Sequence, residues 1–249
     1  MMRNLLYIAL VSLLAGCTDT EPTSLNRFAK DGHVIAMSGA AAGAKNACFT
    51  CHGLDGRGNG AGSPRLAGLD AGYLERQLDA YADGRRYHTQ MRWIAERLDT
   101  DERKAVSYHY ARMKFEADIV AQMGRLRLYH DGDAGRGIQA CAACHGDRGQ
   151  GLGAANPPLA GQPAAYLDDQ FDQWSKSRRR NDPGDVMLRI SQLLTPAERQ
   201  SLARYASRLP GGPPNPESPA AYPATHHGDP RNDASRPPLH VPESARAAQ

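Results

Sequence analysis

The sequence predicts an all-α protein made of two tandem domains of similar design. The chain repeats itself once, apolar residues in each copy recur at helical spacing, and no segment sustains the alternation typical of strands. A chain of 249 residues is long enough for two small domains. We expect them at residues 30–115 and 126–210, with a linker at 116–125.

The internal repeat keeps its register over most of each copy. Cys141 follows Cys48 by 93 residues, and "NPPLAG", starting at Asn156, follows "SPRLAG", starting at Ser63, by the same distance. Further along the offset becomes 96, so the second copy contains three extra residues. Each copy is therefore expected to fold as its own unit.

Helices in the second copy are indicated by apolar periodicity and by capping signals. One helical face is formed by Tyr166, Leu167, Phe171 and Trp174. Thr195 is a candidate N-cap, with Pro196 at the first helical position and Glu198 closing a capping box. Asp99 and Glu102 occupy the equivalent positions in the first copy.

Composition limits the classes of partner. The formal net charge of +3 is spread over mixed signs, whereas a nucleic-acid binder would concentrate basic residues on one face. We therefore expect no nucleic acid partner. Aromatic residues make up only 6% of the chain. Small domains with so little apolar bulk usually depend on a staple, a metal or a cofactor.

Both ends of the chain are expected to lie outside the folded domains. Residues 1–16 resemble a lipoprotein signal peptide that ends in "LLAG" before Cys17, which would be lipidated and followed by a tether over 17–29. An ordinary secretory signal is the alternative. Acyl chains on Cys17 would anchor the protein to the periplasmic side of a bacterial membrane. The Pro-rich segment 211–249 is expected to be a disordered tail.

Two C-x-x-C-H motifs carry the chemistry. They are formed by Cys48, Cys51 and His52 in the first copy and by Cys141, Cys144 and His145 in the second. A redox dithiol would need a βαβ setting, and paired zinc motifs would lie closer together. Covalent attachment of haem fits better, because both thiols can add to vinyl groups while the histidine binds iron. We therefore predict two covalently bound haem c groups.

Methionines at matched positions are candidates for the sixth iron ligand. Met91 and Met187 each lie some forty residues beyond the motif and precede an apolar helix. Together with His52 and His145 they would complete the metal ligands. A thioether favours Fe(II) and raises the reduction potential.

Other side chains in the first copy compete for this role. His88 lies three residues before Met91, and Met113 fits the apolar face of the last helix. Met37 and Met123 precede the attachment motifs and are interpreted as packing residues.

The second copy carries a more specific resemblance, from Gly132 to Leu167. Its "GDAGRGIQACAACHGDRGQG" and "PPLAGQ" segments resemble the dihaem cytochrome c4 family, which consists of tandem class I cytochrome c domains. The resemblance implies electron transfer between periplasmic partners. It also implies that a proline carbonyl, here of Pro64 or Pro157, accepts a hydrogen bond from the axial histidine. The first copy matches less closely.

Arginines cluster shortly before each methionine. Arg85 and Arg86 belong to the first copy, and Arg178, Arg179 and Arg180 to the second. They would either pair with haem propionates or form a solvated basic loop. The sequence leaves both interpretations open.

Three kinds of function remain to be compared. The first is a membrane-anchored electron carrier, with a quinol-oxidising complex or a dehydrogenase as donor and a terminal oxidase or reductase as acceptor. The second is an electron-transfer subunit of a dehydrogenase or oxidase complex. The third is a dihaem enzyme, such as a peroxidase or a sulfur-compound dehydrogenase. An enzyme needs an open iron position, and the paired methionines speak against one.

Overall fold

The computed structural model describes residues 31–60, 62–117 and 124–212. These residues form two compact units, one ending at Phe115 and one starting at Glu116, with residues 60–62 grouped with the second. The expected all-α class is confirmed. The described ranges contain helices and no named strand, and an isolated antiparallel bridge pairs Asp133 with Ile138. No described helix is both long enough and apolar enough to cross a membrane.

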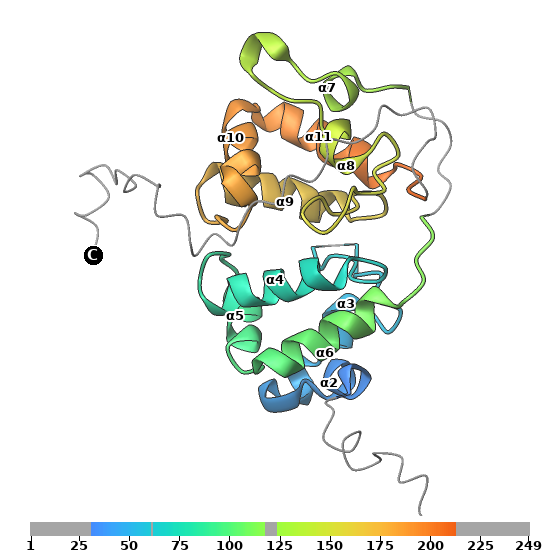
Figure 1. The fold of residues 1–249 in the computed structure, drawn as a ribbon, viewed down its shortest axis with the longest axis vertical. Helices are drawn as coiled ribbons and strands as arrows, with labels where there is room; N and C mark the ends of the chain where they lie inside the picture. Colours follow the sequence, from blue (N-terminus) through green and yellow to red (C-terminus); the bar gives the residue numbers. More distant parts are fainter. Residues whose placement is uncertain (1–30, 61, 118–123, 213–249) are drawn as a thin grey trace, which may run out of the picture. The chain divides into compact units, whose positions relative to one another are not determined.

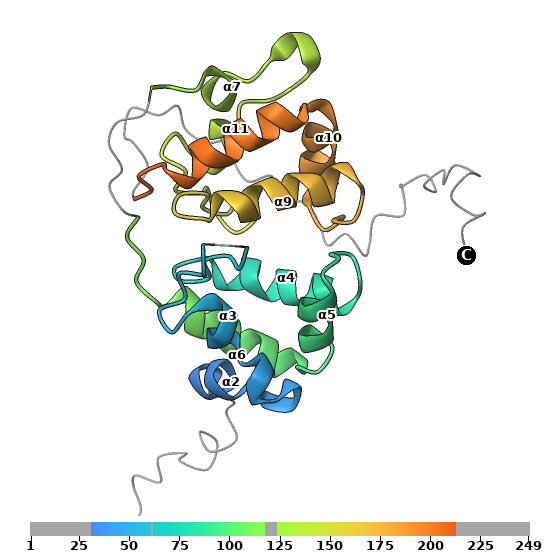
Figure 2. The same ribbon diagram turned by 180° about the vertical axis from the view of Figure 1, so that it is seen from behind.

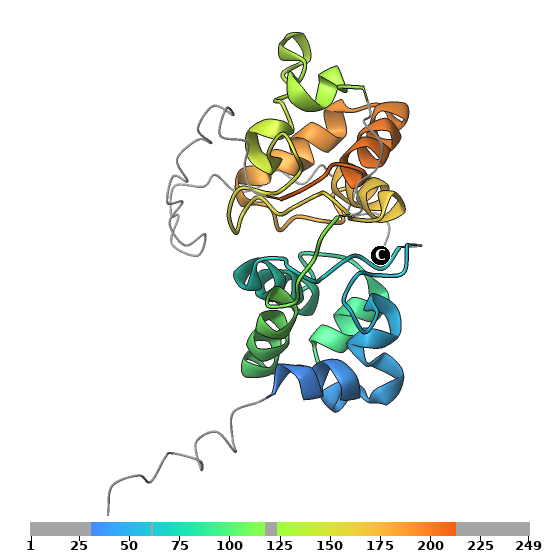
Figure 3. The same ribbon diagram turned by 90° about the vertical axis from the view of Figure 1, so that its right-hand side faces the viewer.

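The first unit contains the first copy of the repeat. Its elements are α2 (Gly32–Ser38), η1 (Ala40–Ala42), η2 (Ala44–Asn46), α3 (Cys48–His52), α4 (Ala71–Ala82), α5 (Thr89–Ala95) and α6 (Thr100–Ala111). Helix α4 packs against both α5 and α6, and α2 packs against α6 and α3 (Figures 1 and 3). The short helix α3 therefore packs on α2, which in turn packs on α6.

The second unit repeats this arrangement. Its elements are α7 (Arg127–His130), η3 (Ala134–Arg136), α8 (Ala142–His145), α9 (Ala164–Ser175), η4 (Pro183–Asp185), α10 (Val186–Leu193) and α11 (Pro196–Ser207). Helix α9 packs against α10 and α11, as α4 does against α5 and α6 (Figure 2). The first helix of the unit is shorter than its counterpart, α2.

Both expected capping boxes are confirmed. The Asp99 side chain accepts from the Glu102 backbone N–H, and the Glu102 side chain accepts in return from the Asp99 backbone. Thr195 and Glu198 make the same reciprocal pair at the start of α11. These bonds satisfy backbone donors that the first helical turn leaves free.

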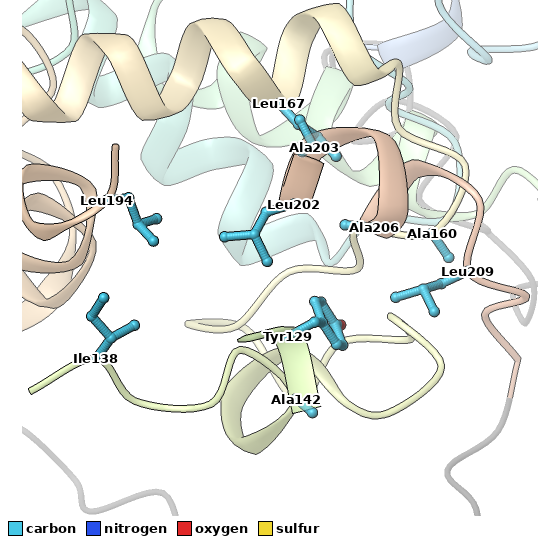
Figure 4. Packing of buried hydrophobic residues seen from close by; sticks show 10 residues of the cluster. All are labelled: Tyr129, Ile138, Ala142, Ala160, Leu167, Leu194, Leu202, Ala203, Ala206 and Leu209. Atoms are coloured by element: carbon cyan, nitrogen blue, oxygen red, sulfur yellow. The ribbon is translucent and has the colours of Figure 1, made fainter. Parts of the chain in front are cut away.

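The cores of the two units fill equivalent space with different side chains. In the first unit Tyr110 on α6 shares a core cluster with Ala36 on α2. In the second the sizes are exchanged, because Tyr129 on α7 shares a cluster with Ala206 on α11. Figure 4 shows Tyr129 between Leu202 and Ala142 in that cluster. The buried cluster of each unit thus contains one tyrosine, which comes from α6 in the first unit and from α7 in the second.

Several expectations lie outside the described residues. They concern the signal peptide over 1–16, the tether and lipidation at Cys17, Met123, and the tail from 213 onward. The interpretation of Met37 as a packing residue is wrong, because its side chain is 39% exposed on α2.

Candidate functional site

In the first unit the C-x-x-C-H motif forms a single helical turn. Helix α3 contains Cys48, Cys51 and His52, and it ends at Gly53, whose positive φ of 80° suits glycine. The two cysteines, three residues apart, share one face of the turn. Neither forms a disulfide, and both are half-buried. His52 is only 7% exposed, so its ring faces the interior of the unit.

The second unit builds the same turn. Cys141 has helical backbone angles and caps α8, which contains Cys144 and His145. His145 is 9% exposed, and Gly146 ends the turn with a φ of 80°. The hydroxyl of Tyr129 donates a 2.8 Å hydrogen bond to the Gly146 carbonyl, which ties the end of the turn to α7.

Each histidine ring is oriented by a proline carbonyl. His52 Nδ1 lies 2.9 Å from the Pro64 oxygen, and His145 Nδ1 lies 2.8 Å from the Pro157 oxygen. A carbonyl can only accept, so Nδ1 carries the proton and Nε2 keeps its lone pair. Burial lowers the pKa of both rings, which favours this neutral form. Both imidazoles are therefore prepared to bind a metal through Nε2.

Glycines allow the proline loops to come this close. Gly58, with a φ of 81°, donates its backbone N–H to the His52 carbonyl at 2.8 Å. A Cβ on Gly58 would lie 2.9 Å from the Pro64 carbonyl carbon. Gly151 repeats the bond to the His145 carbonyl at 2.9 Å, with a φ of 77°. These two glycines do not stand out among the other glycines of the sequence, although the repeat aligns them.

Three of the four thiols differ from the reactive thiol of a redox dithiol. Burial raises the pKa of Cys48 and of Cys141 to about 11, and it also raises the pKa of Cys144. A redox dithiol needs a thiolate, which a low pKa supplies. Half-buried cysteines beside a buried imidazole fit thioether links to a haem.

The structure gives a further sign that the first unit fits such a group. The Tyr110 hydroxyl is buried and has no hydrogen-bond partner among the described residues. Cys48 packs against the same apolar cluster as Tyr110, and so does Met91. Attachment motif, candidate sulfur ligand and an unsatisfied hydroxyl thus meet around one apolar core.

The candidate methionines lie inside helices, not before them. Met91 is in the first turn of α5, and Met187 is in the first turn of α10. The expectation that each precedes its helix is wrong, because a side chain caps the turn ahead of each methionine. His88 Nδ1 accepts from the Met91 backbone N–H at 3.2 Å, and Asp182 Oδ2 accepts from that of Met187 at 2.8 Å.

The competing residues in the first unit take other positions. His88 is the N-cap of α5, where its Nδ1 is used by the hydrogen bond to Met91. Met113 lies just beyond α6 and packs against the core cluster. Its sulfur would be 3.1 Å from a Cβ built on Gly56, so it fills the space beside that glycine.

The arginines before the methionines fall into two groups. Arg85 and Arg178 are exposed and pair with Asp83 and Asp172, as a solvated loop would. Arg86 and Arg179 are each only 4% exposed. The solvated-loop interpretation is therefore wrong for this second pair, whose side chains belong to the interior.

These features define a class of protein: each unit has the fold, attachment motif and oriented histidine of a c-type haem domain. Comparison with protein families matches cytochrome c over residues 36–109 and 133–209, more than half of the chain, and the chain belongs to that family. Two separate matches in one chain also agree with the duplication in the sequence.

Similar curated proteins indicate which group of cytochromes c the chain resembles. The chain is 42% identical over 195 residues to a thiosulfate dehydrogenase electron acceptor of Stutzerimonas stutzeri, covering 75% of this chain and 89% of that protein. It is 31% identical over 188 residues to cytochrome c4 of Pseudomonas aeruginosa, covering 72% and 92%. The resemblance to the dihaem cytochrome c4 family is thus confirmed.

Comparison with solved structures leads to the same proteins. The fold is similar to that of a thiosulfate dehydrogenase from Marichromatium purpuratum, with a TM-score of 0.64 and 34% identity over 77% of this chain. This chain spans only 44% of that longer one. Cytochrome c4 from Pseudomonas stutzeri gives a TM-score of 0.58 at 25% identity, covering 65% of this chain and 93% of that one.

The chain is a cytochrome c4-like dihaem electron-transfer protein, not an enzyme. Two covalently bound haem c groups are its cofactors, one for each C-x-x-C-H motif. The two curated relatives are named as an electron acceptor and as cytochrome c4, which agrees with a carrier and not with the alternative of a dihaem peroxidase or sulfur-compound dehydrogenase.

Proposed function

We propose that this cytochrome accepts electrons from a dehydrogenase that oxidises thiosulfate and passes them to a respiratory acceptor. The observation that carries the proposal is the similarity, at 42% and 36% identity, to two proteins named as thiosulfate dehydrogenase electron acceptors. A likeness to part of a longer thiosulfate dehydrogenase chain gives further support. That likeness also favours a stable complex with the donor.

We further propose that both irons are held between a histidine and a methionine. The ligand pairs are His52 with Met91 and His145 with Met187. Both methionines occupy the first turn of matched helices, and Met91 packs against the same cluster as Cys48. A bound haem then exchanges one electron between Fe(III) and Fe(II) without binding a substrate.

The protein's own side chains have three tasks in this scheme. Cys48, Cys51 and their counterparts hold the cofactor by covalent bonds. Pro64 and Pro157 fix the orientation and tautomer of the histidine rings. The apolar clusters exclude water, and a low dielectric raises the potential by disfavouring the extra positive charge of Fe(III).

A general respiratory carrier is the second candidate. It is favoured by the cytochrome c4 relatives, which match over nearly their whole length. In this case the donor would be a quinol-oxidising complex or another dehydrogenase, and the acceptor a terminal oxidase or reductase. The two candidates share the same haem chemistry and differ in the donor.

The location is also a proposal. Lipidation of Cys17 after removal of residues 1–16 would anchor the cytochrome to the periplasmic side of a bacterial membrane. Mass spectrometry of the mature protein tests this directly, since it detects acyl chains on Cys17. A Cys17→Ala variant should move from the membrane fraction to the soluble fraction. If the unchanged protein is soluble and unacylated, the anchor is wrong.

The donor is tested by rapid mixing. The oxidised dihaem protein is mixed with the purified thiosulfate dehydrogenase of the same organism, with and without thiosulfate, and haem reduction is followed optically. Thiosulfate-dependent reduction of both haems, much faster than that of an unrelated cytochrome c used as a control, supports the first candidate. No reduction beyond that control would refute it and favour the general carrier.

Ligation is tested by spectroscopy. A weak far-red absorption band in the oxidised protein reports a thioether bound to iron. Met91→Ala and Met187→Ala should each remove part of this band. A wild-type protein without the band, or a variant in which it is unchanged, would contradict the proposed ligand at that haem.

A further inference from the structure

In both units, a buried arginine lies where the chain leaves one helix to reach the methionine helix. Arg86 lies between α4 and α5, and Arg179 lies between α9 and α10. They are 93 residues apart, which is the register of the attachment motifs. Both are 4% exposed, an unusual burial for a charged side chain.

Arg86 is fastened to α4 at three points. Its Nη1 donates to Gln77 Oε1 at 2.8 Å, and its backbone N–H donates to the Ala80 carbonyl at 2.9 Å. The guanidinium carbon lies 4.6 Å from the centre of the Tyr81 ring, within cation–π distance. Gln77 is itself buried.

Arg179 makes the same contacts with α9. Its Nη1 donates to Gln170 Oε1 at 2.6 Å, and its backbone N–H donates to the Gln173 carbonyl at 3.1 Å. Its guanidinium carbon lies 3.9 Å from the centre of the Trp174 ring. All three partners are in register with those of Arg86, although an aromatic ring of a different kind is used.

The aromatic ring connects each arginine to the cap of the methionine helix. Trp174 Nε1 donates to Asp182 Oδ1 at 2.9 Å, and the other carboxylate oxygen accepts from the Met187 backbone N–H. In the first unit Tyr81 meets the His88 ring edge-on, at 6.3 Å between centres. His88 in turn accepts from the Met91 backbone N–H. We call each chain of contacts a methionine support.

The three extra residues of the second copy fall within this support. Five positions separate Arg86 from Met91, whereas eight separate Arg179 from Met187. The extra length is taken up in the turn η4, where Gly184 and Asp185 have φ values of 66° and 56°. Both sides of the insertion are held by the support, so the methionine still enters the first turn of its helix.

We propose that Arg86 and Arg179 are positioning residues that hold the methionine sulfurs at the irons, an inference that rests on the proposed ligation by Met91 and Met187. A planar guanidinium can lie flat over a ring and still donate an in-plane hydrogen bond to an amide, a geometry that the tetrahedral ammonium of lysine does not reproduce. Without the guanidinium, the segment before each methionine keeps only its backbone hydrogen bond to the preceding helix. The thioether then dissociates more often, and an external ligand takes its place more easily.

The experiment uses the complete dihaem protein. Arg86→Lys and Arg179→Lys keep the charge but remove the planar group, and Arg85→Gln and Arg178→Gln are matched exposed controls. Imidazole is titrated into each oxidised protein, and the far-red band and the reduction potentials are recorded. Far-UV circular dichroism reports whether the helices are intact.

We expect Arg86→Lys and Arg179→Lys each to bind imidazole about tenfold more tightly at one haem, as the loss of a hydrogen bond from a charged donor would give. The far-red band should weaken and one potential should fall, with helix content unchanged. Arg85→Gln and Arg178→Gln should stay within about twofold of the wild type. A structural role alone would lower stability without changing the imidazole affinity.

Several outcomes would overturn the inference. Lysine variants with the imidazole affinity and far-red band of the wild type would show that the planar guanidinium is not needed to position the methionine. Controls that change as much as the buried variants would show that the effect does not depend on the buried contacts. If Arg179→Lys does not fold, Trp174→Phe is used instead. This variant keeps an aromatic ring but loses the hydrogen bond to Asp182. An imidazole affinity of Trp174→Phe equal to that of the wild type would also refute the methionine support.

These outcomes are distinct from failure of the proposed ligation. If the wild-type protein has no far-red band, or if Met91→Ala and Met187→Ala leave it unchanged, the methionines are not ligands. If that band is present and depends on the methionines, but not on Arg86 or Arg179, ligation stands and only the positioning role is wrong.

Discussion

Replacing Gly151 by alanine tests how the proline loop orients the histidine of the second unit. The new Cβ would lie 2.6 Å from the Pro158 nitrogen and 2.8 Å from the Asn156 oxygen, so the loop must move. A left-handed backbone costs a non-glycine residue about 1–2 kcal/mol, and overpacking adds about 1–3 kcal/mol. We expect a loss of about 2–5 kcal/mol in the free energy of unfolding.

The same shift should weaken the 2.8 Å hydrogen bond from His145 to Pro157. This bond makes the imidazole a stronger donor to iron and so favours Fe(III). A hydrogen bond is worth about 0.5–1.5 kcal/mol, and about 1.4 kcal/mol corresponds to 59 mV for one electron. The potential of one haem should therefore rise by about 20–60 mV.

Gly153→Ala is the matched control. Gly153 also has a positive φ, of 85°, but a Cβ there would meet nothing within 4 Å. It should cost only the backbone term of about 1–2 kcal/mol and leave both potentials unchanged. Urea unfolding and potentiometric titration measure the two effects. Equal potentials in the two variants would refute the link between this loop and the histidine.

Three further predictions concern stability. Thr195→Ala removes a capping-box acceptor and should cost about 1 kcal/mol in urea unfolding; no loss would mean that the box does not stabilise α11. The Arg136 guanidinium, followed by the backbone amide of Thr195, lowers the pKa of Glu198 to about 2. The folded pKa lies below the unfolded value of about 4.5, so this stabilisation is present above pH 4.5 and is lost as the pH falls through 2. Arg136→Gln should therefore be less stable than the wild type at pH 6 but not at pH 2, and a difference independent of pH would contradict the assignment. Tyr129→Phe removes one of two hydrogen bonds to the Gly146 carbonyl, which still accepts from the Gly149 N–H, and should cost about 0.5–1.5 kcal/mol. Tyr110→Phe, whose hydroxyl has no partner in the described chain, should be nearly neutral. A large loss in Tyr110→Phe would show that the cofactor supplies a partner.

The attachment motifs and the fold class could be predicted from the sequence because they depend on local spacing. Two thiols three residues apart, followed by a histidine, fit one helical turn wherever that turn lies. The capping boxes are local in the same sense, and both occur as expected. Duplication strengthened each prediction, since every motif could be compared with its copy.

The difference in burial between Arg86 and its neighbour Arg85 could not be predicted in this way. Both are arginines in one polar stretch, yet one is buried over Tyr81 and its neighbour pairs with Asp83 in solvent. Burial depends on which side of the chain faces α4 after the helix ends. That direction is decided by packing between elements and not by residue type.

The sequence by itself determined the all-α class, the duplication and the residues able to carry two haems, because covalent spacing and helical periodicity act within a few residues. Only the tertiary structure decided how each site is completed. The tyrosine ring of the buried cluster comes from α6 in the first unit and from α7 in the second, and the Tyr129 hydroxyl joins α7 to Gly146 at the end of the second motif. Contacts of this kind form only when the helices pack, so no local pattern encodes them.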